Sequence, residues 1–386
     1  MKVLYIAHSA EMQGAGFALL NILQGMVERN INVYVVVPRE GRLTVILKDM
    51  GIPFLIIPFF NAIYPRFDNT IRSFLLFIPR LFRTLLYNKL AEKRLHVFLK
   101  RRHIDIIHSN TGVIHFGAQV ASKLSIPHVW HIREYQTVGL NYKILGGLEH
   151  LKKELSNSNN HVIAITKGIF DFFHLKENKD IVIYDGVFKT TDNIRLSKQK
   201  ENYFLFVGDL IRGKGIFSAL MAFEEIAKKN PGVEFWIVGN TNADFAKRLE
   251  KSPFKFRIRM FGFCSHVKVY DLMYNAKALL VPSYFEGFGF IVVEAMLNGC
   301  IVIGRNEAGV KEQFDNGLKY TGIEIGLRFE SQAELISRMQ YVCDTSFDNF
   351  IPMIKAAQNV IQKYTVSQNV DPVSYTHLRA HETGAY

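Results

Sequence analysis

Short apolar runs alternate with longer amphipathic stretches along most of this chain. The first half has such runs at Val3–Ala7, Val33–Val37, Phe54–Ile57, Ile104–His108, His128–Trp130, Val162–Thr166 and Ile181–Tyr184. The second half repeats the pattern at Tyr203–Val207, Glu234–Val238, Ile258–Phe261, Ala278–Val281 and Ile301–Ile303. Buried strands alternating with helices are typical of parallel sheets covered on both faces, so the pattern predicts an α/β fold.

A polar, basic stretch from Lys189 to Asn202 separates the two halves and is interpreted as a linker. The sequence therefore predicts a Rossmann-like domain over residues 1–190 and a second one over residues 200–365. Ligands of doubly wound sheets bind at the carboxyl ends of the strands. We expect a ligand cleft between the two domains.

The end of the chain does not continue the pattern. Residues Asp371–Thr383 show no apolar stripe at helical spacing, and they resemble translated sequencing-adapter sequence. We interpret residues 371–386 as a non-native tail that replaces a closing helix, and we exclude it from the prediction of the fold.

The composition agrees with two domains that have apolar cores. The chain has 386 residues, of which 48% are hydrophobic. Cys264, Cys300 and Cys343 lack paired or metal-type spacing, which favours small buried thiols in a reducing compartment. The first apolar run is too short for a signal peptide, and no run of 18 apolar residues occurs. We expect a cytoplasmic protein.

Positive charge is concentrated in one segment. The net charge is +12, and ten Lys or Arg residues lie between Asn61 and Ile104, against the acids Asp68 and Glu92. On a helical wheel one face is apolar (Phe74, Phe77, Ile78, Leu81, Phe82, Leu85) and the other is basic (Arg72, Arg80, Arg83). Pro79 predicts a break between two helices.

Two interpretations of this basic segment stay open. In one, the helices cover the sheet and the basic face lies in water. In the other, residues 66–102 dock on an anionic membrane surface, which makes the protein peripheral at the inner face of the cell membrane.

The richest motif follows the apolar run Ala278–Val281 and reads Pro-Ser-Tyr-Phe-Glu-Gly-Phe-Gly from Pro282 to Gly289. Pro282 ends a strand, and the run after Gly289 is helical in pattern up to Asn298-Gly299. Glu286 then lies on the loop and Glu294 two turns into the helix. Free amides at the start of a helix favour an anionic ligand.

This arrangement resembles the donor site of family 4 retaining glycosyltransferases ("glycosyl transferases group 1"), which have the GT-B fold. The resemblance implies transfer of a sugar from a nucleotide-diphosphate sugar to an acceptor hydroxyl, with Glu286 beside the donor sugar. It also implies that Glu294 accepts hydrogen bonds from ribose hydroxyls. The loop residues Gly287, Phe288 and Gly289 would stabilise the leaving diphosphate.

Other parts of the second half fit the same resemblance. In Phe206–Gly215, Lys214 stands where the family binds the diphosphate with a lysine. The arginine that usually follows the first glycine is replaced by Asp209, and Arg212 is the candidate substitute. Gly262 ends a strand at a place where the family holds its nucleotide.

The first half resembles the family in two places. Gly14, Ala15 and Gly16 follow the first strand and are similar to a glycine-rich loop that faces the donor. His131, in His-Ile-Arg-Glu, is similar to a histidine of polysaccharide-forming members that approaches the donor sugar. The resemblance therefore implies a catalytic pair of Glu286 and His131.

No Asp-x-Asp occurs among the 14 aspartates, so we expect a hexosyltransferase-type enzyme that needs no metal and no cofactor beyond its nucleotide-sugar co-substrate. The expected setting is cell-surface polysaccharide or lipid-linked glycan assembly. One alternative is a non-catalytic GT-B protein that binds nucleotide sugars. A Rossmann dehydrogenase is disfavoured because no Gly-x-Gly-x-x-Gly follows a strand. Nucleic-acid binding is disfavoured because the basic segment lacks a base-stacking platform.

Overall fold

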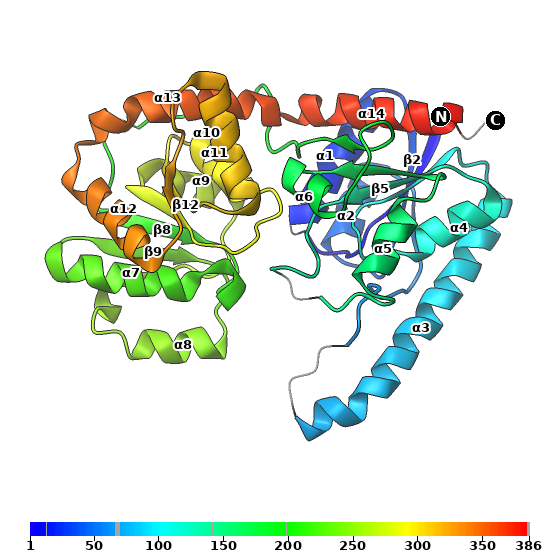
Figure 1. Cartoon of the computed structure of the whole chain (residues 1–386), viewed down its shortest axis with the longest axis horizontal. Coiled ribbons are helices and arrows are strands. Elements are labelled where there is room, and N and C mark those ends of the chain that lie inside the picture. Colours follow the sequence, from blue (N-terminus) through cyan, green and yellow to red (C-terminus); the bar gives the residue numbers. More distant parts are fainter. Residues whose placement is uncertain (13, 66–69, 140–141, 198, 384–386) are drawn as a thin grey trace. The chain divides into compact units, whose positions relative to one another are not determined.

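The computed structural model describes residues 1–12, 14–65, 70–139, 142–197 and 199–383 (Figure 1). The chain forms two compact units. The first unit comprises Met1–Gly186 together with the C-terminal stretch from Val366, and the second comprises Val187–Thr365.

The first unit is built on a parallel sheet in the order β3-β2-β1-β4-β5-β6-β7. Its strands are β1 (Lys2–Ile6), β2 (Asn32–Val37), β3 (Phe54–Ile56), β4 (Ile106–Ser109), β5 (His128–Ile132), β6 (Asn160–Ala164) and β7 (Ile181–Val182). Its helices are α1 (Gly14–Glu28), α2 (Arg42–Asp49), α3 (Ile71–Lys100), α4 (Phe116–Leu124), α5 (Leu148–Leu155), α6 (Lys167–Phe172) and α14 (Val366–Thr383).

Alternate residues of the central strands enter two separate cores. Val3 and Tyr5 of β1 pack with α1, α2 and α14 on one face, and Leu4 and Ile6 pack with α3 and α4 on the other. Because successive side chains of a strand point to opposite faces, a strand buried on both faces must be apolar throughout. This explains the continuous apolar runs of the sequence.

The second unit has a parallel sheet in the order β10-β9-β8-β11-β12-β13. Its strands are β8 (Tyr203–Val207), β9 (Glu234–Val238), β10 (Ile258–Met260), β11 (Ala278–Val281), β12 (Ile301–Arg305) and β13 (Leu327–Phe329). Its α-helices are α7 (Ile216–Lys229), α8 (Ala243–Glu250), α9 (His266–Asn275), α10 (Phe290–Leu297), α11 (Ala308–Thr321), α12 (Gln332–Asp344) and α13 (Ile351–Val360). Short 3-10 turns are η1 (Arg212–Lys214), η2 (Lys255–Arg257), η3 (Phe347–Phe350) and η4 (Ile361–Tyr364).

Helices α7, α8 and α12 share one core with the second sheet, to which Phe223, Phe245 and Leu335 contribute buried side chains. Helix α10 contacts β12, α9 and α13, and α11 contacts β12 and α13. Both sheets reverse their strand order once, between β1 and β4 in the first and between β8 and β11 in the second. In doubly wound folds, the loops on either side of such a reversal hold the ligand.

The predicted α/β fold of two doubly wound halves is confirmed, and each of the twelve predicted strands overlaps a strand of the structure. Strand β13 was not predicted, since its three residues include Arg328 and make too short an apolar run.

The polar, basic stretch 189–202, predicted as the linker from its composition, does not lie at the junction of the two units. The units meet in sequence at Gly186 and Val187, and again at Thr365 and Val366. The stretch 189–202, of which residue 198 is outside the described part, packs on the second unit. There Arg195 N donates to Leu297 O (2.9 Å), and Lys200 Nζ donates to Gly299 O (2.9 Å).

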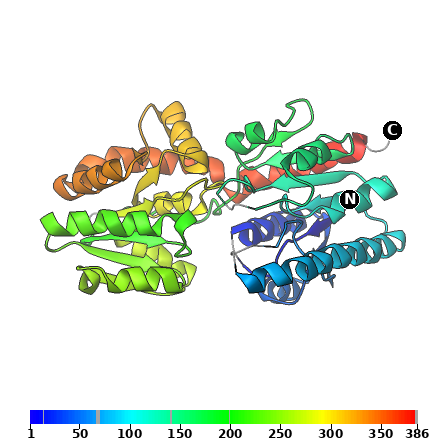
Figure 2. The ribbon, with the colours of Figure 1, turned by 60° about the horizontal axis from the view of Figure 1, so that its bottom comes forward.

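Helix α3 is unbroken, so the prediction of a break at Pro79 is wrong. The Thr70 hydroxyl accepts from Ser73 N and caps the start of the helix. Pro79 removes the hydrogen bond to the carbonyl of Leu75, but both residues are exposed, so water can satisfy that carbonyl. Arg66 and Asp68 of the predicted basic segment lie outside the described residues. The length of α3 can be followed in Figure 2.

Helix α14 includes most of the residues interpreted above as a non-native tail. Val373 and Ala380 are fully buried in the core that contains α1, and α14 contacts α1. The expectation that residues after 370 lack an apolar face is therefore wrong. Their interpretation as a substitute for another closing helix stays a prediction, and residues 384–386 lie outside the described part.

Candidate active site

In the second unit, the loops after β8 and β11 lie on either side of the point where the strand order reverses. The β8 loop ends in η1, whose last residue is Lys214, and helix α7 begins two residues later at Ile216. The β11 loop carries Glu286, and helix α10 begins at Phe290. The topology therefore brings together two residues that are 72 positions apart in sequence.

Lys214 and Glu286 form an ion pair. Lys214 Nζ donates to both carboxylate oxygens of Glu286, at 3.0 and 2.9 Å, and the two side chains are 37% and 18% exposed. Burial alone would lower the pKa of Lys214, but the charge of Glu286 outweighs burial and raises it. Burial alone would raise the pKa of Glu286, but the Lys214 ammonium and a hydrogen bond from Ser283 hold it below its usual value. Both groups are therefore charged at neutral pH.

Gly215 permits the close approach of the two loops. It has φ +74°, and a Cβ at this position would lie 2.2 Å from the carbonyl oxygen of Pro282. Tyr284 N donates to Gly213 O at 3.0 Å, which ties the loops together just beside Lys214. Only glycine combines this backbone conformation with this contact.

The turn into α10 is fixed from both sides. Phe288 is buried and packs its ring against Phe290 and Tyr364. Gln313 Nε2 donates to Phe288 O (2.6 Å), and Gly309 N donates to Glu286 O (2.9 Å). These contacts hold residues 287–289 in place at the start of α10, where unpaired amides and the helix dipole attract anions.

Glu294 lies on α10 with its side chain 12% exposed. Burial raises the pKa of this carboxyl to about 7. His266 Nδ1 lies 3.9 Å from its Oε1, too far for a hydrogen bond. Within the described residues no hydrogen bond to this carboxylate is found, so Glu294 keeps its capacity to accept hydrogen bonds from a ligand.

The remaining predicted residues of the second unit occupy different surroundings. Arg212 is exposed, and its guanidinium lies 4.7 Å from the centroid of the Phe217 ring. Gly262 O accepts from Gly239 N (2.8 Å), which joins the ends of β10 and β9 beside the β8 loop. Asp209 is exposed and its charge contributes to the raised pKa of Lys214.

In the first unit, the predicted glycine-rich loop forms the first turn of α1. Asn110 Nδ2, from the loop after β4, donates to Ala15 O at 2.9 Å. Gly14 is exposed with open space around it, whereas Gly16 is buried and a Cβ there would lie 2.8 Å from Glu11 O. Gly16 is thus required for packing, and Gly14 is the glycine available to a ligand.

His131 does not lie at an accessible position. Its side chain is fully buried on β5, with Nδ1 3.2 Å from Arg133 Nη2 and the ring beside His108. Burial and the Arg133 charge hold its pKa well below the usual value, so the imidazole is neutral. His131 is the fourth residue of the central strand β5, all five residues of which are buried.

Sequence reasoning missed the buried network around Arg133. Arg133 Nη1 forms an ion pair with Asp185, and both side chains are less than 5% exposed. Arg133 also donates to Asn110 O (3.1 Å) and Asn110 Oδ1 (3.0 Å). Burial raises the pKa of Asp185 although Arg133 opposes this. Arg133 thereby joins the ends of β4 and β5 to the end of the first unit. In the sequence, the acidic residue at position 185 is the signal that could have indicated this network.

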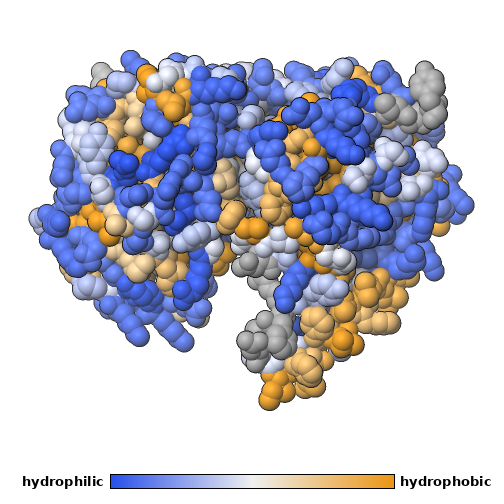
Figure 3. Space-filling model, in the orientation of Figure 1, coloured by the Kyte–Doolittle hydropathy of each residue, from blue (hydrophilic) through white to orange (hydrophobic). Residues whose placement is uncertain are grey.

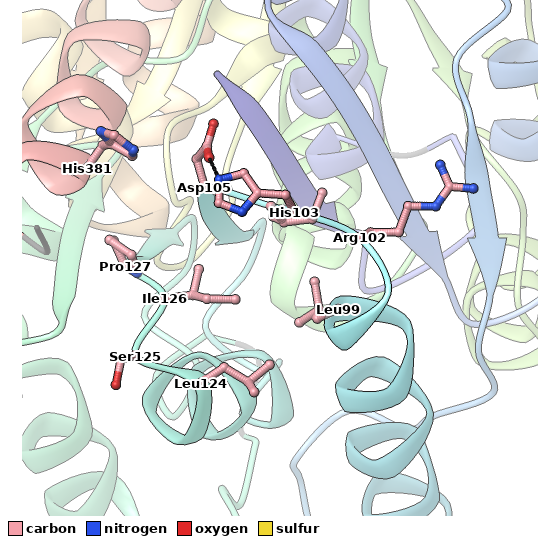
Figure 4. Close-up of a pocket in the computed structure, with 10 residues that line it drawn as sticks. Leu99, Arg102, His103, Asp105, Leu124, Ser125, Ile126, Pro127 and His381 are labelled. Atoms are coloured by element: carbon pink, nitrogen blue, oxygen red, sulfur yellow. Dashed lines mark ion pairs between the residues drawn. The ribbon is translucent and has the colours of Figure 1, made fainter.

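The described residues contain no group of three or more His, Cys, Asp or Glu side chains placed to hold a metal ion. A cavity of about 370 Å³ lies next to the amino ends of β4 and β5, where His103 and Asp105 form an ion pair at 3.1 Å (Figure 4). Because ligands of doubly wound sheets bind at the opposite, carboxyl ends, this cavity is separate from the predicted site.

Residues 187–339 match the family model of glycosyl transferases group 1. An uncharacterized glycosyltransferase of Methanocaldococcus jannaschii is 30% identical over 229 residues, which cover 57% of this chain and 60% of that protein. A second one from the same organism is 27% identical over 54% of this chain and 59% of its own length. The chain thus spans about 60% of the length of these two curated relatives.

Solved structures share the fold over nearly the whole chain. HepE of Anabaena, solved in complex with UDP, gives a TM-score of 0.74 at 18% identity and covers 97% of this chain and 99% of its own. Sucrose-phosphate synthase of Thermosynechococcus elongatus gives 0.70 at 14% identity and covers 99% of both chains. Together with the two parallel sheets, these similarities confirm the predicted GT-B fold.

Proposed function

We propose that this protein is a glycosyltransferase that moves a sugar from a nucleotide-diphosphate sugar to an acceptor hydroxyl, because residues 187–339 match the family model of glycosyl transferases group 1. The ion pair of Lys214 and Glu286 at the strand reversal of the second unit is the observation that carries the proposal. HepE, with the same fold, was solved with UDP and with UDP-glucose.

In the proposed site, the donor diphosphate competes with Glu286 for Lys214. Two phosphate groups carry more negative charge than one carboxylate, and the amides at the start of α10 add to their binding. Lys214 then stabilises the charge of the leaving diphosphate as the bond to the anomeric carbon breaks. Glu286, released from Lys214, lies beside the sugar and stabilises positive charge that develops there.

Glu294 binds the nucleotide in this proposal. Its carboxylate has free acceptor capacity and accepts hydrogen bonds from the ribose hydroxyls. Gly14 and the first turn of α1 are proposed to contact the donor. His131 receives no contact with substrate here, since it is fully buried.

We further propose a retaining, metal-independent hexosyl transfer in cell-surface polysaccharide or lipid-linked glycan assembly, at the cytoplasmic side of the cell. Resemblance in sequence is the support for stereochemistry and setting. Support for metal independence comes from the cationic site itself, because Lys214 and helix amides can carry the charge of the diphosphate without a divalent ion.

The proposal is tested by measuring release of nucleoside diphosphate from UDP-glucose, GDP-mannose and ADP-glucose, with and without EDTA. Each donor is assayed first in acceptor-free buffer and then with candidate acceptors. Slow release from one of the three donors, unaffected by EDTA, supports a metal-independent transferase. Tight donor binding without release, in the presence of candidate acceptors, supports the alternative of a non-catalytic nucleotide-sugar-binding protein. A folded chain that neither binds nor cleaves any donor contradicts both.

A further inference from the structure

The first four turns of α3 carry an apolar stripe whose side chains are largely exposed. At 100° per residue its members fall within a sector of about 120°. They are Ile71 (82% exposed), Phe74 (68%), Leu75 (66%), Ile78 (67%), Phe82 (66%), Leu85 (51%) and Leu86 (43%). Figure 1 shows this end of α3 projecting from the first unit, and Figure 3 shows hydrophobic side chains gathered there.

This exposure contradicts one part of the sheet-covering interpretation, namely that the apolar face of α3 lies against the sheet. If α3 covered the sheet with its apolar face, Phe74, Ile78 and Phe82 would be buried. Instead the opposite face is buried, through Ser73, Thr84 and, further along, the core residues Ala91, Leu95 and Leu99. The large outward side chains therefore have another role, since exposed apolar patches of this kind mark interaction surfaces.

The outward sector of α3 changes from apolar to cationic along the helix. Lys89, Lys93 and Lys100 occupy the same sector as Ile71 and are exposed. Lys89 pairs with Glu92 at 3.0 Å, whereas Lys93 and Lys100 form no ion pair with any described residue. One side of a single helix thus presents apolar groups first and free ammonium groups next.

A groove lies beside the cationic half. It has a volume of about 560 Å³ and lies between α3 and β3. Apolar and basic side chains both line it; the apolar ones are Leu55, Ile56, Ile57, Val97 and Phe98, and the basic ones are Lys93, Arg94, Arg101 and Arg102. Within the described residues no acid pairs with Arg94 or Arg101. Such a groove fits an amphiphile with an anionic head.

We propose that α3 docks on an anionic phospholipid bilayer, with the apolar stripe immersed among the acyl chains and the groove holding a lipid phosphate. The stripe extends over 16 residues, or about 24 Å of helix, and none of the described helices is long and apolar enough to cross a bilayer. The helix therefore lies in the interface. The proposal deepens the membrane interpretation of the sequence and does not rest on the proposed sugar transfer.

The cations and the apolar stripe of α3 together favour an anionic lipid surface over other partners. A second copy packed through α3 would offer no free acid to Lys93, Arg94, Lys100 and Arg101, because Glu92, the one acid of that helix, already pairs with Lys89 and Lys123. Nucleic acid would satisfy the cations but leave seven large apolar side chains in water. An anionic lipid surface satisfies both, and each Lys or Arg near it strengthens binding about fivefold.

Flotation of the full chain with lipid vesicles tests the proposal. We expect binding to vesicles of phosphatidylcholine and phosphatidylglycerol (7:3) that weakens as salt rises, and at least tenfold weaker binding to pure phosphatidylcholine. The variant Phe74→Ser/Ile78→Ser/Phe82→Ser should lose binding to both vesicles. The variant Lys93→Gln/Arg94→Gln/Arg101→Gln should lose roughly a hundredfold on the anionic vesicles only.

Matched controls come from the second unit. Phe256→Ser/Val267→Ser removes comparably exposed apolar groups, and Lys247→Gln/Lys251→Gln/Lys268→Gln removes the same number of charges from exposed positions. Both controls should bind as the parent chain does, and all variants should keep its melting temperature within 2 °C or so. Each altered side chain of the controls is remote in sequence from α3.

Three results would overturn the proposal. The first is a folded chain that does not float with anionic vesicles at low salt. The second is an equal loss of binding in the charge control, which would mean attraction by net charge alone. The third is a parent chain that is a dimer in sedimentation equilibrium and a stripe variant that is a monomer, with neither binding to vesicles. That result would assign the stripe to contact with a second copy of the chain.

Discussion

The raised pKa of Glu294 predicts that donor binding depends on pH. Burial raises the pKa of this carboxyl to about 7, so about half of the molecules carry it protonated at neutral pH. A ribose hydroxyl donates to the ionised carboxylate, while a protonated carboxyl offers one acceptor fewer. Affinity for the nucleotide sugar should therefore rise as pH rises through 7.

The size of the effect follows from the fraction of competent protein. If only the ionised form binds, the apparent Kd is multiplied by 1 + 10^(pKa − pH), which is about 11 at pH 6 and about 1.1 at pH 8. Affinity should thus increase roughly tenfold between these pH values. The diphosphate of a nucleotide sugar is a diester and does not titrate in this range, so the slope belongs to the protein.

Titration calorimetry at pH 6, 7 and 8 measures this slope, with the most tightly bound of UDP-glucose, GDP-mannose and ADP-glucose. The Glu294→Gln variant keeps the shape of the side chain but cannot titrate, so its affinity should be flat with pH and below that of the parent chain at pH 8. A parent slope that persists unchanged in Glu294→Gln would refute the reasoning, because another group would then carry it.

Two further predictions concern stability. Arg133→Met leaves Asp185 buried without its partner and should cost about 3–5 kcal/mol at pH 7 in urea unfolding. The loss should shrink toward pH 5, because the pKa of Asp185, already raised by burial, rises further without Arg133 and the carboxyl then binds a proton in the folded state; an equal loss at both pH values would contradict this. Gly215→Ala places a Cβ against Pro282 O at φ +74° and should cost roughly 3 kcal/mol. Gly322→Ala, at φ +69° in open space, should cost about 1 kcal/mol, and similar losses for both would show that the contact with Pro282 contributes nothing.

The strands and the strand-reversal site were predictable because their signals are local. A strand buried on both faces needs an apolar run, so β1, β8 and β11 are visible in the sequence alone. The sequence motif around Glu286 located this residue on the loop before a helix. The strand order of the structure then places Lys214 on the neighbouring loop. The pairing of Lys214 with Glu286 follows from the order of the strands in the sheet. The hydrophobic periodicity of the sequence does not predict that order.

Other features depend on tertiary contacts and could not be predicted from pattern. The burial of His131 depends on elements distant in sequence that cover β5, and the Arg133–Asp185 pair joins positions 52 residues apart. In α3, four of the six residues on the predicted apolar face (Phe74, Ile78, Phe82 and Leu85) belong to the exposed stripe, whereas Phe77 and Leu81 are half-buried. The direction of the face could not be predicted, because an apolar face toward a core and one that points outward have the same spacing. The packing of α14 could not be predicted either, because its buried residues Val373 and Ala380 are separated by polar residues.

The role of the Lys214–Glu286 pair is the central claim, and donor cleavage by variants of the pair tests it most directly. Lys214→Met and Glu286→Gln should each reduce release of nucleoside diphosphate by roughly a hundredfold or more. Lys311→Met, which removes an exposed lysine paired with Asp315 in the same unit, should stay within about twofold of the parent chain. Release that survives at the parent rate in Lys214→Met would contradict the account.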